Sequence, residues 1–343
     1  MNFMSDNVVG CAPEILAALA AANEGAVPSY GADPLTERVT RDLAELFETD
    51  VTVFPVATGT AANALALSVL TPPYGAIYCH DEAHIQVDEC GAPELLSGGA
   101  KLMPLPGAHG KIDTGTLATA LEKGGAGFVH HVQPAALSLT QATESGTVYT
   151  PDEVAALADI ARGHKLRVHM DGARFANAVA HLACAPADIT WRAGVDVLSF
   201  GATKNGALAA EAVIFFDKAL ADSFGYRRKR AGHLFSKMRF LSAQLDAYLT
   251  DGLWLRLATH ANAMAARLAQ GLGALPGVGL RSPVQANEVF AIMPEPMTAG
   301  LEAAGFHFYR WDGPVNRLVT AWNTEPAHVD AFLATARGLA GIV

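Results

Sequence analysis

The sequence predicts an α/β fold, with a seven-stranded, mostly parallel sheet in a large domain and a smaller C-terminal α/β domain. Three observations predict it. The 343 residues suffice for about two domains of roughly 150 residues each. Hydrophobic residues make up 51% of the chain and charged residues 17%, so a large core can be buried. Short apolar runs alternate with helix-like segments, which is typical of parallel strands joined by helices.

Seven apolar runs in the first 240 residues are expected to be strands. They are 51–56, 76–79, 101–105, 127–139, 166–170, 195–200 and 212–216, of which 127–139 is longer and could contain a loop. Helices are expected between them at 59–70, 113–123, 151–164 and 175–183. The third of these helices has the clearest start, because Thr150 precedes Pro151 and two acidic residues.

The flanking segments complete a division into three parts. Residues 1–30 form an N-terminal arm with a short helix at 13–22, residues 31–240 the large domain, and residues 241–343 the small domain. In the small domain, 241–270 is expected to be one long helix. Short strands at 289–293 and 318–322, with helices near 297–304 and 327–340, follow it.

The net charge and the spacing of the cysteines exclude some classes of partner and favour one cellular compartment. The net charge of -10 argues against nucleic acid and anionic membranes as partners. The basic run Arg227–Arg230 is either a solvated helix face or a group that reaches a phosphate. No apolar run reaches 18 residues, and the N-terminus lacks a basic signal-peptide region. The four cysteines show no CxxC spacing, which favours a cytoplasmic protein with reduced thiols.

Polar residues that follow the strands are the candidate site, because ligands of open α/β sheets bind at the carboxyl ends of strands. Thr58-Gly59-Thr60 follows the first strand and opens a helix. Its free N–H groups could bind a phosphate, although an ordinary helix cap explains the same pattern. Asp171 follows another strand, and its carboxylate could hold a cationic ring nitrogen or cap the next helix.

Lys204 is the least expected of these residues, because it ends the apolar strand at 195–200. A partly desolvated lysine has a lowered pKa and can form a Schiff base. We expect the small residues Gly201 and Ala202 to leave room for a flat ring. A phosphate nest, an acid and a lysine, in this order along the chain, together indicate pyridoxal 5'-phosphate as cofactor.

His80, Asp81 and His84 follow a further strand and could bind a metal. We expect no metal, because histidines four apart share a face only on a helix, and His84 fits a ring stacked on the cofactor better. His130 and His131 are expected on opposite faces of a strand, so they are unlikely joint ligands.

At this point the chain resembles the L-threonine aldolases, of fold type I among pyridoxal-phosphate enzymes. The resemblance runs nearly end to end. It rests on the following segments: Ser5-Asp6-Asn7, Tyr30-Gly-Ala-Asp-Pro34, Thr58-Gly-Thr-Ala-Ala-Asn63, Ala83-His84, His169-Met-Asp-Gly-Ala-Arg174, Thr203-Lys204-Asn-Gly206 and Asn316-Arg317-Leu-Val-Thr320. The segments 88–94, 140–144 and 237–242 are similar to those of the bacterial low-specificity kind.

The resemblance implies a role for each matching residue. Lys204 would carry the cofactor, Asp171 would bind its ring nitrogen, and His84 would stack on the ring near the substrate hydroxyl. The phosphate would lie on Thr58, Gly59 and Thr60, with Thr203 also touching the cofactor. The substrate carboxylate would be held by Ser5, Arg174 and Arg317, with Arg174 also reaching the ring.

The implied reaction is the reversible cleavage of L-threonine, L-allo-threonine and other L-β-hydroxy-α-amino acids to glycine and an aldehyde. The implied assembly is a homotetramer with sites at a dimer interface, where Arg227–Arg230 and the segment around Tyr30 would serve the neighbouring site. One residue departs from the family. Gln141 stands where many members have a second active-site histidine, and it would line the substrate site without being able to titrate. Either that second histidine is not the essential base in the family, or His84 takes the role here, directly or through a water molecule.

Three alternatives remain. Another fold-type-I activity, such as β-elimination, transamination or cleavage of phenylserine, would use the same cofactor residues. An inactive homologue with a structural role would often lack Lys204 or Asp171, and both are present. A nicotinamide dehydrogenase is disfavoured because no GxGxxG follows the first strand.

Overall fold

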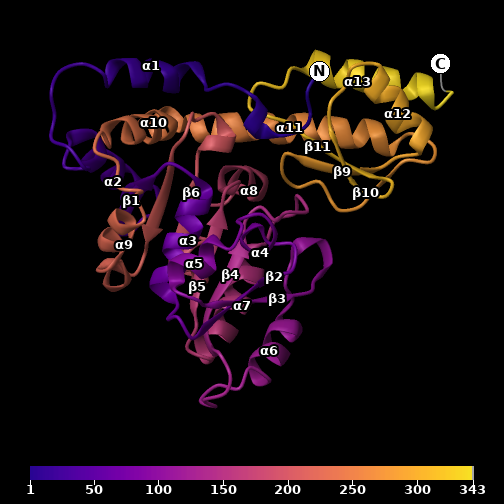
Figure 1. Cartoon of the computed structure of the whole chain (residues 1–343). Helices are drawn as coiled ribbons and strands as arrows, with labels where there is room; N and C mark the ends of the chain where they lie inside the picture. The colour runs from indigo at the N-terminus through magenta and orange to yellow at the C-terminus, as the bar shows by residue number, and fades with distance from the viewer. Residues whose placement is uncertain (342–343) are drawn as a thin grey trace.

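A seven-stranded sheet forms the centre of the computed structural model, which describes residues 1–341 (Figure 1). Its strands are β1 (Thr52–Val56), β2 (Gly75–His80), β3 (Lys101–Leu105), β4 (Gln133–Thr140), β5 (Arg167–Gly172), β6 (Val197–Gly201) and β7 (Glu211–Phe215). Their order in space is β1-β7-β6-β5-β4-β2-β3. Only β7 is antiparallel to its neighbours, which confirms the predicted mostly parallel sheet.

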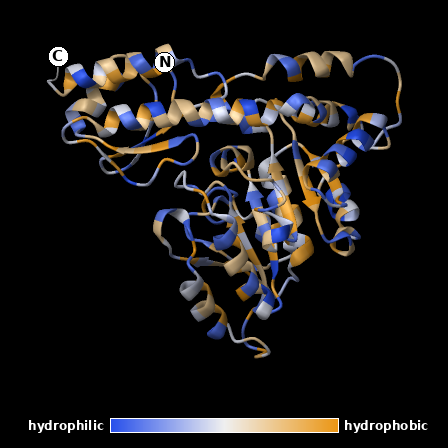
Figure 2. Cartoon of the chain, turned by 180° about the vertical axis from the view of Figure 1, so that it is seen from behind, coloured by the Kyte–Doolittle hydropathy of each residue, from blue (hydrophilic) through white to orange (hydrophobic). Residues whose placement is uncertain are grey.

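Helices cover both faces of this sheet, which explains why most residues of its inner strands are buried. On one face lie α3 (Gly59–Leu70), α5 (Ala92–Ser97) and α9 (Phe224–Arg230). On the other lie α2 (Pro34–Leu46), α6 (Thr114–Glu122), α7 (Pro151–Gly163), α8 (Phe175–Leu182) and α10 (Arg239–Leu249). Figure 2 shows the central strands as largely hydrophobic, whereas the outer helices alternate hydrophobic and hydrophilic stretches.

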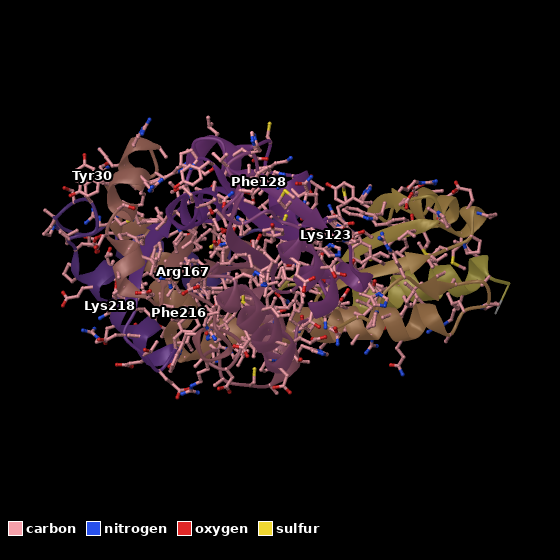
Figure 3. The ribbon with its side chains drawn as sticks, turned by 90° about the horizontal axis from the view of Figure 1, so that it is seen from below. Tyr30, Lys123, Phe128, Arg167, Phe216 and Lys218 are labelled. Atoms are coloured by element: carbon pink, nitrogen blue, oxygen red, sulfur yellow. The ribbon has the colours of Figure 1, made fainter. Side chains whose placement is uncertain are left out.

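Two predicted elements differ from the structure. The strand expected at 127–139 begins only at Gln133, and the preceding residues form turns. His130 and His131 therefore lie in a surface turn, where both rings contact exposed Phe128, which is labelled in Figure 3. The single helix expected at 241–270 is divided at Thr250–Gly252, because Asp251 and Gly252 adopt positive φ angles of 51° and 65°.

The C-terminal part contains a second sheet of four strands, in the order β10-β11-β9-β8. These are β8 (Gly279–Leu280), β9 (Glu288–Ile292), β10 (Tyr309–Asp312) and β11 (Val315–Val319). The long helix α11 (Leu253–Gly273) runs from the region of α10 to this sheet, and α12 (Glu295–Ala303) and α13 (Pro326–Leu339) pack beside it (Figure 1). The strands β8 and β10 were not predicted.

The N-terminal arm connects the two sheets. The Phe3 N–H donates to the His307 carbonyl (2.7 Å) and the Val319 N–H donates to the Phe3 carbonyl (2.8 Å), so the first residues extend the C-terminal sheet. The chain then passes through the short helix Asp6–Val8 to α1 (Pro13–Ala21), which packs on α10 (Figure 1). No helix among residues 1–341 is long and apolar enough to cross a membrane.

Candidate active site

A cavity of about 220 Å³ opens at the carboxyl ends of β1, β5 and β6. It brings together seven of the residues predicted for the site, namely Thr58, Gly59, Thr60, His84, Asp171, Thr203 and Lys204. It is also lined by Asn7, Ala57, Asn63, Glu89, Ala173 and Glu211, which the sequence analysis did not select.

The start of α3 forms an anion-binding end of this cavity. Thr58 caps the helix, since its hydroxyl accepts a hydrogen bond from the Ala61 N–H (3.2 Å). The N–H groups of Gly59 and Thr60 belong to the first turn and have no carbonyl partner within the helix. Apart from its chain neighbours and the backbone of its own helix, no atom of residues 1–341 lies within 4 Å of the position that a Cβ of Gly59 would take. A phosphate group fits this open end of the helix.

Lys204 lines the cavity from a short turn, Thr203–Asn205, that follows β6. Asn205 fixes the turn by donating to the Tyr248 hydroxyl and the Trp254 carbonyl, both at 2.7 Å. The expectation for Gly201 is corrected. A Cβ there would lie 2.6 Å from the Ala173 carbonyl oxygen, so this glycine allows close approach of the backbone after β5 rather than space for a ring.

Asp171 is held as a hydrogen-bond acceptor at the end of β5. Its Oδ1 accepts from the Ala173 N–H (3.0 Å) and its Oδ2 from the Asn63 side-chain amide (2.8 Å). His169, two residues earlier on the same face of β5, is fully buried between the hydroxyls of Ser138 and Ser199 (both 2.9 Å). Burial lowers the pKa of His169 to about 4, so this ring is neutral at neutral pH. The anionic group at this end of β5 is therefore the Asp171 carboxylate. A protonated ring nitrogen fits this carboxylate.

His84 is the first residue of the short helix α4 (His84–Val87), and its ring is partly exposed to the cavity. Its Nδ1 lies 2.9 Å from Oε1 of Glu89, whose side chain is fully buried. The hydrogen bond to Glu89 raises the pKa of His84 above its ordinary value. Sequence reasoning missed Glu89, although it follows His84 by five residues in a segment already matched to relatives of the bacterial kind.

Glu211 is a second buried acid that sequence reasoning missed. It begins β7, opposite Gly201 of β6, and its Oε2 accepts a hydrogen bond from the Ala202 N–H (2.9 Å). Burial raises the pKa of Glu211 to about 7, while a hydrogen bond from Thr203 opposes this rise. The carboxyl group therefore titrates near neutral pH beside Lys204.

Arg174 does not line the cavity, in contrast to its predicted contacts with substrate and cofactor. Its guanidinium is buried and donates to Asp6 through Nε (2.9 Å) and Nη2 (3.2 Å), and Nη1 lies 3.3 Å from Glu288. Asp6 in turn accepts from the Asn287 amide (3.0 Å). The arginine thus ties the N-terminal arm to β9, and binding a substrate carboxylate requires these bonds to rearrange.

Ser5 and Arg317, predicted to hold the substrate carboxylate, also lie outside the cavity lining. The Ser5 hydroxyl accepts from the Asn7 N–H (3.1 Å). The Arg317 guanidinium lies over the rings of Tyr309 (5.2 Å) and Trp311 (5.0 Å) and donates to the Met4 carbonyl (3.4 Å). Both residues belong to the junction of the N-terminal arm with the C-terminal sheet.

The expectation that Gln141 lines the substrate site is corrected. Its side chain is fully buried and makes two bonds to the Tyr149 backbone, donating to the carbonyl (2.8 Å) and accepting from the N–H (3.0 Å). Three residues later, Glu144 is partly exposed. Burial raises the pKa of Glu144, and the charges of Lys204 and Arg174 lower it, so this carboxyl group lies within electrostatic reach of the cavity. The titratable group contributed by this loop is therefore Glu144.

The basic run Arg227–Arg230 ends α9. Arg228 is buried against its own chain, where it donates to the Pro55 carbonyl (3.0 Å) and lies over the Phe54 ring. Arg227 and Arg230 instead line a separate surface cavity of about 440 Å³ beside α5. Within this run, Arg228 is therefore buried, whereas Arg227 and Arg230 belong to a basic groove at the surface.

Comparison with known proteins identifies the family of the chain. The family model described as beta-eliminating lyase matches residues 2–295. The low specificity L-threonine aldolase of a Pseudomonas species is 45% identical over 340 residues, which cover 98% of this chain and 97% of that protein. The low specificity L-threonine aldolase of Pseudomonas aeruginosa is 46% identical over 326 residues, or 94% of this chain and 93% of that protein.

Solved structures show the same fold. The threonine aldolase of Leishmania major superposes with a TM-score of 0.93 at 31% identity, and 99% of each chain is covered. The putative L-allo-threonine aldolase of Listeria monocytogenes superposes with a TM-score of 0.74 at 16% identity, over 100% of this chain and 96% of that one. The second likeness concerns the fold alone.

Proposed function

The chain belongs to the low specificity L-threonine aldolases, lyases within the beta-eliminating lyase family, and on that premise we propose that it reversibly cleaves L-threonine and L-allo-threonine. The products would be glycine and acetaldehyde, and other L-β-hydroxy-α-amino acids would give glycine and the matching aldehyde. The proposed cofactor is pyridoxal 5'-phosphate. One observation carries the proposal, namely that Lys204, Asp171 and the open N-terminus of α3 line one cavity.

The cavity residues fit this cofactor group by group. The N–H groups of Gly59 and Thr60, with the Thr58 and Thr203 side chains near them, would hold the phosphate. Asp171 would accept a hydrogen bond from the protonated ring nitrogen, Lys204 would bind the cofactor covalently, and His84 would stack on the ring. When bound, the cofactor supplies an electron sink for the bond that breaks between Cα and Cβ.

The protein's own groups would bind and orient the substrate. Arg317, with Ser5 and a rearranged Arg174, would hold the carboxylate and so direct the Cα–Cβ bond toward the cofactor ring, a positioning effect. His84 would remove the β-hydroxyl proton through Nε2, since its Nδ1 is bound to Glu89. Glu144 would be the competing base, because it is a carboxyl group within electrostatic reach of Lys204 and His84.

The visible spectrum of the purified protein tests the cofactor, and product analysis with L-threonine tests the reaction. We expect a coloured protein whose spectrum changes on addition of glycine, and equal amounts of glycine and acetaldehyde. Lys204→Ala should abolish activity and the covalent attachment. The matched control is Lys123→Ala, at an exposed lysine that follows α6 (Figure 3). A protein that stays colourless with added cofactor, or an active Lys204→Ala variant, contradicts the proposal.

A second candidate reaction is β-elimination, which the description of the matching family model favours. The same cofactor residues would serve it, but L-threonine would give a keto acid and ammonia instead of glycine and an aldehyde. The product analysis therefore distinguishes the two reactions. Aldol cleavage of a bulkier substrate such as phenylserine would still release glycine, and the aldehyde identifies the side chain.

We also propose a homo-oligomer, a tetramer, with the groove of Arg227 and Arg230 facing a neighbouring subunit. Leu95, which lines this groove, and Tyr226 on α9 are large apolar side chains that lie mostly exposed in the single chain. Light scattering after size-exclusion chromatography tests the assembly. A monomeric Leu95→Asp variant would support this face as an interface, whereas a monomeric native protein would refute the proposal.

A further inference from the structure

A continuous row of hydrogen bonds connects Asp171 to His84. The Asn63 side-chain nitrogen donates to Asp171 Oδ2 (2.8 Å) and to Glu89 Oε1 (2.9 Å). The same Glu89 oxygen lies 2.9 Å from Nδ1 of His84. Asn63 comes from α3, Asp171 from the end of β5, and the other two from α4 and the turn that follows it. Three separate elements therefore build one polar row along the cavity.

The row assigns the two ring nitrogens of His84 to different partners. Because Glu89 accepts a bond from Asn63, it acts as an acceptor toward His84 as well, and Nδ1 of the ring must then carry the proton. In a neutral imidazole with its proton on Nδ1, the other nitrogen, Nε2, has a free lone pair. Since the His84 ring is partly exposed to the cavity, Nε2 is the atom that can accept a proton from a ligand.

The charges around Glu89 and His84 also favour a proton on Nδ1 of His84. The Glu89 side chain has no exposed surface, and its Oε2 has no hydrogen-bond partner among the described residues. Burial keeps the pKa of Glu89 above its ordinary value and the charge of Asp171 adds to this rise, while the bonds from His84 and Asn63 oppose it. The pKa of His84 is raised mainly by Glu89, with smaller contributions from Glu144 and Asp171 and an opposing one from Lys204. The carboxylate and the imidazole thus favour each other's charged forms.

We propose that Glu89 is the positioning residue of His84: it keeps the ring proton on Nδ1, increases the basicity of Nε2, and so presents Nε2 to the β-hydroxyl group of the substrate. Asn63 fixes Glu89 relative to Asp171, so the residue that binds the cofactor ring and the residue that removes the proton share one support. This inference rests on the proposed function for its substrate, but the contact itself can be tested without substrate.

The decisive variant is Glu89→Gln, with Asp88→Asn as the matched control. Glutamine can keep an oxygen at the Oε1 position and place its amide nitrogen at the Oε2 position, where no residue among 1–341 makes a hydrogen bond, so the charge is removed while the bond from Asn63 is kept. Asp88 is the exposed neighbour in the same turn, and its contact with His84 is a backbone one, from the Asp88 N–H to the His84 carbonyl (2.9 Å), which Asp88→Asn leaves in place. The imidazole pKa is read by NMR of the cofactor-free protein with ¹³C-labelled histidine, and His84→Asn assigns the signal.

We expect the pKa of His84 to fall by at least about 1 pH unit in Glu89→Gln, as for a group that loses an opposite charge at hydrogen-bond distance. In Asp88→Asn it should stay close to the native value. An unchanged pKa in Glu89→Gln, or an equal fall in Asp88→Asn, would overturn the proposal. If the protein fails to bind the cofactor, the proposed function fails, yet this titration still reports the contact.

The pH profile of the loaded enzyme distinguishes positioning from a merely structural role. In Glu89→Gln the acidic limb of kcat/KM should move to lower pH with the pKa of His84, and the plateau should fall at least about tenfold because a weaker base removes the proton. If Glu89 had only a structural role, the variant would have a lower plateau of kcat/KM, but the acidic limb of the profile would stay at the same pH. That second result would refute the assignment.

Asn63→Ala tests whether Asn63 fixes Glu89 relative to Asp171. Two carboxylates then face each other without the amide between them, so we expect both weaker cofactor binding, by about tenfold, and an altered His84 pKa. Cofactor affinity is measured by quenching of protein fluorescence, independently of activity. Native cofactor affinity together with a native His84 pKa in this variant would refute the link through Asn63.

Discussion

Glu211 should make the cofactor-free protein less stable as pH rises through neutrality. The group is 7% exposed, and burial raises its pKa from an ordinary 4.5 to about 7. Between these values the folded chain holds a proton that the unfolded chain has released, so the free energy of unfolding falls as pH increases. The difference between the two pKa values, at about 1.4 kcal/mol per pH unit, amounts to about 3 kcal/mol.

The perturbation is Glu211→Gln, which keeps an oxygen for the Ala202 N–H and cannot ionise. We expect Glu211→Gln to gain free energy of unfolding relative to the native protein as pH rises. The difference between the two proteins should be about 2–3 kcal/mol larger at pH 8 than at pH 5. The assay is urea unfolding of the cofactor-free protein at both pH values and equal protein concentration. Glu122→Gln, at an exposed site on α6, is the control. If the free energy of unfolding changes with pH by the same amount in the native protein and in Glu211→Gln, the reasoning is refuted.

Three further variants test the corrected site. Gln141→His should cost about 1–3 kcal/mol of stability in thermal unfolding without raising kcat, because it breaks two buried bonds to Tyr149; a faster enzyme would contradict this. Asp6→Asn should cost about 3 kcal/mol in urea unfolding, because the buried Arg174 loses one of its two charged partners and keeps only Glu288; native stability would show that the pair contributes nothing. Glu144→Gln should keep kcat for L-threonine within about threefold, and a loss of about 100-fold would make Glu144 the base instead of His84.

The sequence predicted the sheet and much of the cavity because these features are local. Each of Thr58, Asp171 and Lys204 directly follows an apolar run, and strand ends of a parallel sheet meet at one edge. The break between α10 and α11 was missed because it depends on the positive φ angles of Asp251 and Gly252 inside an otherwise helical pattern. The strand β10 was missed because all four of its residues are exposed.

The supporting residues of the cavity could not be predicted in the same way. Asn63 looks like an ordinary polar residue of an alanine-rich helix, and Glu89 like a surface acid in a turn. Their roles depend on Asp171, which is 108 positions away from Asn63 in the chain. Gln141 was placed by analogy with a short motif, whereas burial of its side chain against Tyr149 depends on the whole loop.

The route of the N-terminal arm has a consequence for how the protein is made in the cell. Residues near Phe3 and Asp6 leave the ribosome first, yet they pair with Val319, His307 and Asn287, which are made about 300 residues later. At typical elongation rates of about 5–20 residues per second, the arm waits for about 15–60 s. During this time Asp6 lacks its partner Asn287, and Arg174 lacks its partner Glu288. The cavity wall is therefore completed at the end of synthesis, and a nascent chain that lacks its last 60 residues has no finished site.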